Sequence, residues 1–151
     1  MNNSQSVFWL SGNSGAGKST MAFALKRKLV TDGIKNIVVL DGDEMRETIS
    51  THEDLSPEGR RSHNLRVARL ASLLSKQGMI VLVCVIAPFE AARKEATEIC
   101  SPHWIYVKRD GLDAPDRPYE PPANPELTLN HDTMTKEESL IALEEFVRSY
   151  L

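Results

Sequence analysis

Short apolar segments alternate with longer amphipathic segments along the 151 residues of the chain. Short runs of aliphatic and aromatic residues predict buried strands over 7–10, 37–40, 80–85, 104–107 and 127–129. Helical patterns fill the intervals, over 18–31, 44–49, 56–77, 88–98 and 135–150. This alternation favours an α/β fold with a central parallel sheet, and the strongly apolar segment 80–85 is the expected central strand.

Local signals indicate where two of these helices begin and where regular structure stops. Ser56 and Pro57 suit an N-cap and a first-turn proline, and Thr135 with Glu138 forms a capping-box pattern. Segment 110–126 is rich in proline, so no regular element is expected there. No repeat or linker divides the chain, and residues 1–151 are therefore expected to form a single domain.

Charge and cysteine content exclude several classes of protein. A formal net charge of −3 gives no long-range attraction for nucleic acid or an anionic membrane, so neither is expected as a partner. Cys84 and Cys100 lie in or near apolar segments without CxxC spacing, which predicts reduced, buried thiols. The start, Met1–Ser6, lacks signal-peptide features, and the apolar run 79–88 is too short to span a bilayer. We therefore expect a cytoplasmic protein.

A complete phosphate-binding motif follows the first predicted strand. Its sequence, GxxxxGK[ST], is formed by Gly12, Asn13, Ser14, Gly15, Ala16, Gly17, Lys18 and Ser19. The glycines let successive N–H groups point at phosphate oxygens, and the N-terminus of the following helix adds positive potential. Lys18 is placed to bridge the β- and γ-phosphates and Ser19 to ligate Mg²⁺. The predicted cofactors are therefore ATP and Mg²⁺.

The motif alone does not define the reaction, because kinases, ATPases, GTPases and passive sensors share it. A GTPase is disfavoured because the chain has no NKxD-type guanine signature. A motor or transporter ATPase would need a longer chain and a strand ending directly in Asp-Glu. Small size and isolated clusters of charge favour a kinase that phosphorylates a small molecule.

Two carboxylates and three basic or amide side chains are candidates for the second half of the site. Asp41 and Asp43 follow the strand 37–40, at the edge of a parallel sheet where ligands bind, and could serve Mg²⁺ or an attacking hydroxyl. The same Asp-Gly-Asp sequence also suits a turn with a helix cap. Arg46 shares a helix face with Asp43, and Arg60 shares one with Asn64. These three could grip an anionic acceptor or form a solvated basic face.

The histidines and the aromatic residues of the first strand carry no catalytic pattern. The four histidines lack metal-ligand spacing, and we expect surface or loop positions for His52, His63, His103 and His131. Phe8 and Trp9 are expected in the core.

Blocks spread from Val7 to Leu129 resemble the adenylyl-sulfate (APS) kinases. They occur in the order of that family and comprise 8–20, Leu40-Asp41-Gly42-Asp43 with Arg46, Ser56-Pro57-Glu58 with Arg60 and Asn64, 85–89, Arg109-Asp110, 118–122 and 124–127. The resemblance implies a P-loop, nucleotide-kinase-like three-layer fold that is often dimeric. It also implies transfer of the γ-phosphate of ATP to the ribose 3′-hydroxyl of APS.

The resemblance also assigns roles to residues. Gly12 through Thr20 would bind ATP, Arg109 would lie by its adenine, and Ser19 and Asp41 would serve the metal. Lys18, Asp41 and Asp43 would carry the chemistry. The residues that would hold the acceptor nucleotide are Arg46, Arg60, Asn64 and Ile86.

Three departures from the family pattern affect the acceptor half. A basic lid of some two dozen residues, with a phenylalanine that stacks on the adenine of APS, is missing after Arg109-Asp110. Leu55 stands where the second stacking phenylalanine is expected, and Ala87 replaces a serine sometimes assigned as a phosphorylated intermediate. Two alternatives to APS phosphorylation follow: a kinase of another activated nucleotide, such as cytidine diphosphoramidate in polysaccharide modification, or an ATP-binding module without turnover.

Overall fold

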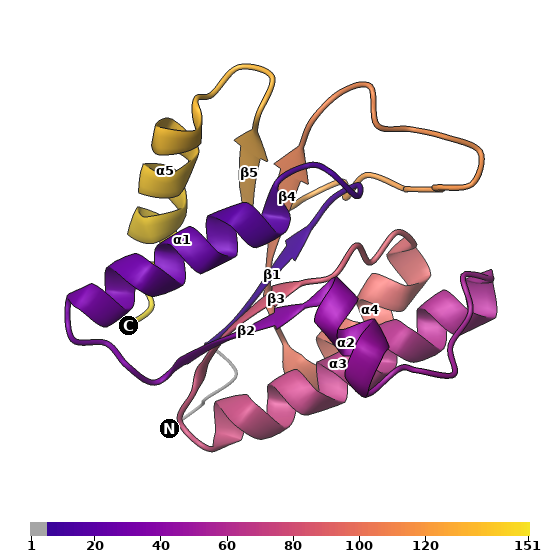
Figure 1. The fold of residues 1–151 in the computed structure, drawn as a ribbon, viewed down its shortest axis with the longest axis horizontal. Helices are drawn as coiled ribbons and strands as arrows, with labels where there is room; N and C mark the ends of the chain where they lie inside the picture. The colour runs from indigo at the N-terminus through magenta and orange to yellow at the C-terminus, as the bar shows by residue number, and fades with distance from the viewer. Residues whose placement is uncertain (1–5) are drawn as a thin grey trace.

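The computed structural model describes residues 6–151, in which five parallel strands form one sheet in the order β2-β3-β1-β4-β5 (Figure 1). The strands are β1 (Val7–Ser11), β2 (Ile37–Asp41), β3 (Ile80–Cys84), β4 (His103–Lys108) and β5 (Leu127–Asn130). The predicted α/β fold with a parallel sheet is confirmed. The expected central position of segment 80–85 is only approximate, because β1 occupies the middle and β3 lies beside it. Both strands are fully buried, so apolarity alone could not rank them.

Helices cover both faces of the sheet and complete a three-layer fold. Figure 1 shows α1 (Lys18–Thr31) and α5 (Lys136–Arg148) on one face, and α2 (Gly42–Thr48), α3 (Pro57–Lys76) and α4 (Glu90–Cys100) on the other. Successive side chains of β1 point to opposite faces of the sheet, so this strand packs against both layers of helices. Phe8 and Leu10 pack in the core under α1 and α5, while Val7 and Trp9 pack in the core under α3 and α4. The expected core positions of Phe8 and Trp9 are confirmed.

The predicted starts of α3 and α5 are confirmed, and a local cap defines each of them. The Ser56 hydroxyl accepts from the Gly59 N–H at 3.1 Å, and both hydrogen bonds of the Thr135–Glu138 capping box are present. By contrast, α4 begins two residues later than expected, at Glu90. The Glu90 N–H donates to the carboxylate of Glu120 at 3.0 Å, a partner supplied by the proline-rich segment. Local sequence could not reveal that long-range contact.

The proline-rich segment following β4 contains no helix or strand, as expected, and its one bridge joins Ala114 to Arg117. It is nevertheless fixed to the domain, because the Glu120 N–H donates to Pro88 O at 2.7 Å. Within residues 6–151, no helix is long and apolar enough to cross a bilayer. Most of the polar start noted above, residues 1–5, lies outside the described part of the chain.

Candidate functional site

All five strands end at one edge of the sheet, and the residues that follow them surround one cavity. Its volume is about 380 Å³, within the range of small-molecule sites. It is lined by the phosphate loop after β1, by Asp41 at the end of β2 and by Ile86 after β3. Arg109 after β4 and His131 after β5 complete the ring. Parallel pairing thus gathers side chains from the beginning of the chain, such as Ser14, and from near its end, such as His131.

The phosphate loop has the curled backbone that its sequence predicts. Gly15 and Gly17 adopt φ values of 88° and 102°, a region that favours glycine, and Gly17 caps the start of α1. The Ala16 N–H donates to Asn13 O at 3.0 Å, which closes the turn. The loop therefore presents main-chain N–H groups and the N-terminus of α1 to the cavity, the arrangement that binds phosphate. Ser14 through Thr20 all line the cavity.

Lys18 lies inside this loop, with 7% of its surface exposed. Its Nζ donates to Gly12 O at 2.7 Å and to Asn13 O at 2.9 Å. Burial lowers the pKa of Lys18 to about 8, and electrostatic interactions with Cys84, Asp41 and Asp43 oppose that shift in part. Carbonyl oxygens are weak substitutes for an anion, so this ammonium group is poised to exchange them for phosphate oxygens.

Ser19 and Asp41 form the expected pair of oxygen donors. The Ser19 hydroxyl donates to a carboxylate oxygen of Asp41, whose second oxygen accepts from the Glu44 N–H at 3.5 Å and caps α2. Asp41 can therefore cap α2 with one carboxylate oxygen and take part in the site with the other. Oxygen donors from two residues fit Mg²⁺, which usually takes one or two protein ligands together with water and substrate phosphates. Within residues 6–151, His, Cys, Asp and Glu side chains form no cluster of three for another metal.

The residues predicted to hold the acceptor converge on the other side of the cavity. Arg46, Arg60, Asn64 and Ile86 all line it, from α2, α3 and the turn after β3. Burial lowers the pKa of Arg46, and the neighbouring charge of Arg60 lowers it further. Two guanidinium groups that repel each other in this way favour an anion between them.

Arg60 and Asn64 have no carboxylate to satisfy them among the described residues. Arg60 is 8% exposed, and its guanidinium donates to Leu55 O at 2.7 Å and to Asp116 O at 3.4 Å. Asn64 is 2% exposed, and no described residue accepts a hydrogen bond from its Nδ2. A buried amide donor without a partner is costly, so a ligand group at this position would satisfy it.

Arg109 and Asn13 lie near the outer side of the phosphate loop. Arg109 follows β4, and its Nη1 lies 3.4 Å from Gly15 O. Asn13 donates from Nδ2 to Asp113 at 3.1 Å, which ties the loop to the proline-rich segment. Every site residue predicted from the sequence is thus placed in or beside one cavity.

The expectation that all histidines are surface or loop residues was wrong for two of them. His63 is buried in α3, where its Nδ1 contacts Ser50 Oγ at 2.8 Å; burial, helped by Arg46, lowers its pKa to about 4. His103 is buried in β4. His52 is exposed, and His131 lies in the loop after β5. Both side chains are buried by the fold, and a spacing pattern does not reveal that burial.

Sequence reasoning also missed four titratable side chains that line the cavity: His63, Cys84, His131 and Lys136. His131 donates from Nδ1 to Ala16 O at 2.7 Å and so supports the back of the phosphate loop. A signal existed, because His131 lies two residues after the last predicted strand, 127–129. Cys84 and Cys100 are free and buried, as expected, and burial raises the pKa of both thiols.

Comparisons with known proteins agree with this geometry. The model of the adenylylsulphate kinase family matches residues 4–110. A probable adenylyl-sulfate kinase of Pyrococcus abyssi is 37% identical over 155 residues, which cover 87% of this chain and 88% of that protein. The adenylyl-sulfate kinase of Bacillus pumilus is 33% identical over 172 residues, which cover 97% of this chain and 87% of that protein.

A solved structure supports the same assignment. The APS kinase CysC of Mycobacterium tuberculosis, solved in complex with AMPPNP and APS, superposes with a TM-score of 0.77 at 26% identity. The match covers 93% of this chain and 96% of that chain. The family model matches most of this chain, and relatives above 30% identity align with nearly all of it. The chain therefore belongs to the adenylylsulphate kinase family.

Proposed function

We propose that the chain transfers the γ-phosphate of ATP to the ribose 3′-hydroxyl of adenylyl sulfate. The observation that carries the proposal is the two-sided cavity: the phosphate loop forms one side, and Arg46, Arg60 and Asn64 form the other. The relatives of this chain, which are adenylyl-sulfate kinases, indicate the substrate. A kinase needs this arrangement because transfer is mostly a matter of positioning donor and acceptor and stabilising charge.

On the ATP side, the main-chain N–H groups of residues 12–19 hold the triphosphate, and Lys18 contacts its terminal phosphates. Lys18 leaves the carbonyls of Gly12 and Asn13 to do so. Ser19 and Asp41 would hold Mg²⁺, which when bound neutralises charge on the phosphate oxygens. Arg109 covers the adenine, a role supported by its position beside Gly15 O of the phosphate loop.

On the acceptor side, Arg46 and Arg60 bind the anionic part of the nucleotide, and Asn64 donates to it from its unpaired Nδ2. Asp43 lies in the first turn of α2 and lines the same cavity, where a carboxylate can accept the proton of the attacking hydroxyl. Transfer is direct, because Ala87 has no hydroxyl that could carry the phosphoryl group.

The missing lid is part of the proposal. The alignment with the Pyrococcus abyssi protein runs over 155 residues, yet it covers only 87% of this 151-residue chain. Because 87% of this chain amounts to fewer residues than the alignment is long, the alignment includes positions that the relative has and this chain lacks. The family model stops matching at residue 110, where the resemblance places the lid. In its place, the proline-rich segment contacts Asn13 and Arg60, and Lys136 adds a cation to the cavity lining.

We also propose that the protein works in the cytoplasm, where ATP is available, and as a homodimer. Sedimentation at assay concentrations tests the dimer.

A coupled assay of ADP release tests the proposed function. We expect turnover that depends on APS, with weaker or no turnover on cytidine diphosphoramidate. Turnover on the cytidine compound alone would reassign the acceptor. Tight ATP binding without turnover on any acceptor would identify an ATP-binding module instead and contradict the proposal.

ATP affinity should depend on the ionisation of Lys18. The charged ammonium binds phosphate, and its pKa is about 8 in the free protein. Affinity should therefore be full well below pH 8 and fall roughly tenfold per pH unit above it, with net proton uptake on binding near pH 8. Calorimetry in buffers of different ionisation enthalpy measures both effects. The Lys18→Met protein is the control, and an unchanged wild-type affinity up to pH 10 would refute the expectation.

The carboxylates should matter for turnover more than for ATP binding. We expect Asp41→Asn and Asp43→Asn each to lower kcat by about a hundredfold or more, while the Kd for ATP without metal changes little. Steady-state kinetics with calorimetry separates the two quantities. Glu44→Gln, one residue away in α2, is the matched control. Either variant retaining normal kcat would remove that carboxylate from the mechanism.

Asn64 should contribute to acceptor binding without contributing to stability. Because its buried Nδ2 has no partner in the described residues, Asn64→Leu should leave the free energy of unfolding within about 1 kcal/mol of wild type or raise it. The KM for the acceptor should rise while the KM for ATP stays constant. Denaturant unfolding and steady-state kinetics test this pair of outcomes. Strong destabilisation with normal acceptor KM would show a structural role only.

A further inference from the structure

The turn after β3 holds a non-glycine residue in a left-handed conformation. Ala87 has a φ of 49°, and Ser101 is the only other non-glycine residue with positive φ in the described chain. Ser101 terminates α4, where that conformation is common. Ala87 lies at no helix end; it lines the cavity on the acceptor side. Left-handed backbone costs alanine about 1–3 kcal/mol and persists only where the surroundings enforce it.

A series of hydrogen bonds fixes the carbonyl of Ile86, the residue before Ala87. The Ser11 hydroxyl donates to Ile86 O at 2.7 Å, and Ser11 Oγ lies 2.7 Å from the Tyr119 hydroxyl. Ser11 has a single hydroxyl hydrogen, which the Ile86 carbonyl takes, so Tyr119 must be the donor to Ser11. Burial raises the pKa of Tyr119 to about 12, which keeps that hydroxyl protonated.

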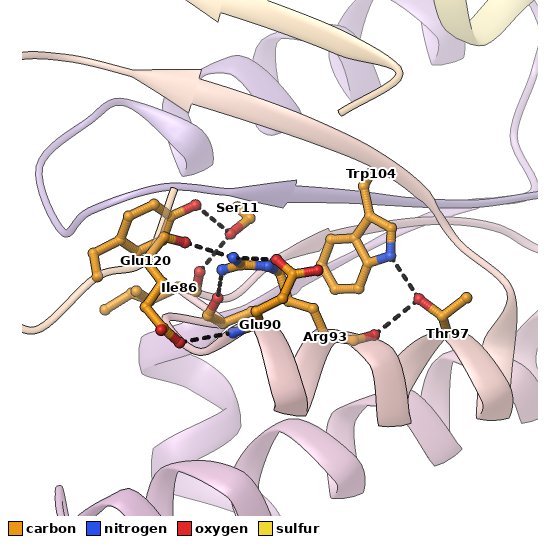
Figure 2. Close-up of polar contacts among 9 residues, drawn as sticks. Ser11, Ile86, Glu90, Arg93, Thr97, Trp104 and Glu120 are labelled. Atoms are coloured by element: carbon orange, nitrogen blue, oxygen red, sulfur yellow. Dashed lines mark hydrogen bonds and ion pairs between the residues drawn. The ribbon is translucent and has the colours of Figure 1, made fainter. Parts of the chain in front are cut away.

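The buried guanidinium of Arg93 fixes the carbonyl of Ala87. Arg93 of α4 is 3% exposed, and its Nη1 donates to Ala87 O at 2.6 Å. Its Nη2 donates to Glu90 Oε2 at 2.8 Å and also to Glu120 O (Figure 2). The guanidinium carbon lies 5.6 Å from the centre of the Tyr119 ring. Arg93 thus joins three segments: the turn, the start of α4 and the proline-rich segment.

These contacts determine which way the peptide between Ile86 and Ala87 faces. In a trans peptide the C=O and N–H point in opposite directions. With the Ile86 carbonyl directed at Ser11, the Ala87 N–H faces away from Ser11. Pro88 has no N–H, so the Ala87 N–H is the single main-chain donor that these two peptides offer. The chain from Val85 to Pro88 lines the cavity, so this orientation decides what an acceptor meets there.

We propose that Arg93 and Tyr119 are positioning residues for the acceptor: they hold Ile86 and Ala87 in the strained turn that the acceptor nucleotide contacts. The inference rests on the proposed function for the identity of the acceptor. The proline-rich segment thereby contributes to the site, because Tyr119 bonds to Ser11 and the carbonyl of Glu120 accepts from Arg93. Lysine cannot replace Arg93, since one ammonium lacks the planar fork that reaches several carbonyls at once.

Kinetics of matched variants test the proposal. Arg93→Gln, Arg93→Lys and Tyr119→Phe should each raise the acceptor KM, by about tenfold or more for the arginine variants, with the KM for ATP within about twofold of wild type. Thr97→Val is the control: Thr97 bonds to Trp104 and to Arg93 O on the same helix but does not touch the turn (Figure 2). It should lower stability without changing the acceptor KM.

A rescue experiment separates positioning from stability. Glycine adopts positive φ without strain. Adding Ala87→Gly to the Arg93→Gln protein should therefore lower its raised acceptor KM part of the way to the wild-type value. If Arg93 only stabilised the fold, Ala87 would already keep its conformation in the Arg93→Gln protein, and Ala87→Gly would leave the acceptor KM of that protein unchanged.

A structural measurement keeps this test independent of the proposed activity. Crystal structures of the wild type and of Tyr119→Phe and Arg93→Gln should show Ala87 leaving positive φ in at least the arginine variant. The proposal is overturned if Ala87 keeps its conformation there, or if the KM values for ATP and acceptor rise together. Absence of APS-dependent turnover in the wild type would instead contradict the proposed function, while the crystal structures would still decide whether Arg93 holds the turn.

Discussion

Parallel pairing of five short strands is the constraint on which the site depends, because it brings every strand's carboxyl end to the same edge. Register makes this concrete: Asp41 of β2 lies opposite Cys84 of β3, and Ser11 of β1 lies opposite Tyr106 of β4. With β1 in the middle, the phosphate loop occupies the centre of that edge. Side chains from both halves of the chain can then reach a triphosphate held there.

The electrostatics of the edge indicate an anionic ligand more clearly than any single residue does. Three arginines of α3 differ in their partners. Arg61 and Arg66 pair with Glu95 and Glu53 on the outside of the molecule, whereas Arg60 bonds only to main-chain oxygens among the described residues. Lys18 likewise has only carbonyl acceptors, and its pKa is lowered. Buried cations without carboxylate partners are costly in the free protein, and bound phosphate groups offset that cost.

Sequence reasoning succeeded where the determinant is local and failed where it is tertiary. The phosphate loop, the Ser56 cap and the capping box at Thr135 depend on neighbours within a few positions, and the structure has each of them. The start of α4 and the burial of His63 and His103 depend on segments far away in the sequence. The role inferred for Arg93 belongs to the second class, because its partners Glu120 and Tyr119 come from a proline-rich segment with no regular structure.

The same distinction explains why the acceptor side was harder to predict than the ATP side. A glycine-rich loop encodes its own conformation, so its ligand can be inferred from eight consecutive residues. The acceptor pocket combines α2, α3, the turn after β3 and contacts from the proline-rich segment, and spacing along the chain carries little of that information. Two features became visible only in three dimensions: the Nδ2 of Asn64, which has no partner among residues 6–151, and the left-handed backbone of Ala87.

The most direct test of the account is a crystal structure of the protein with AMPPNP, Mg²⁺ and APS. We predict a triphosphate enclosed by residues 12–19, with Lys18 Nζ moved from the carbonyls of Gly12 and Asn13 to phosphate oxygens. The ribose 3′-hydroxyl of APS should face the terminal phosphorus, with the nucleotide held by Arg46, Arg60 and Asn64. APS bound elsewhere, or a 3′-hydroxyl directed away from that phosphorus, would contradict it.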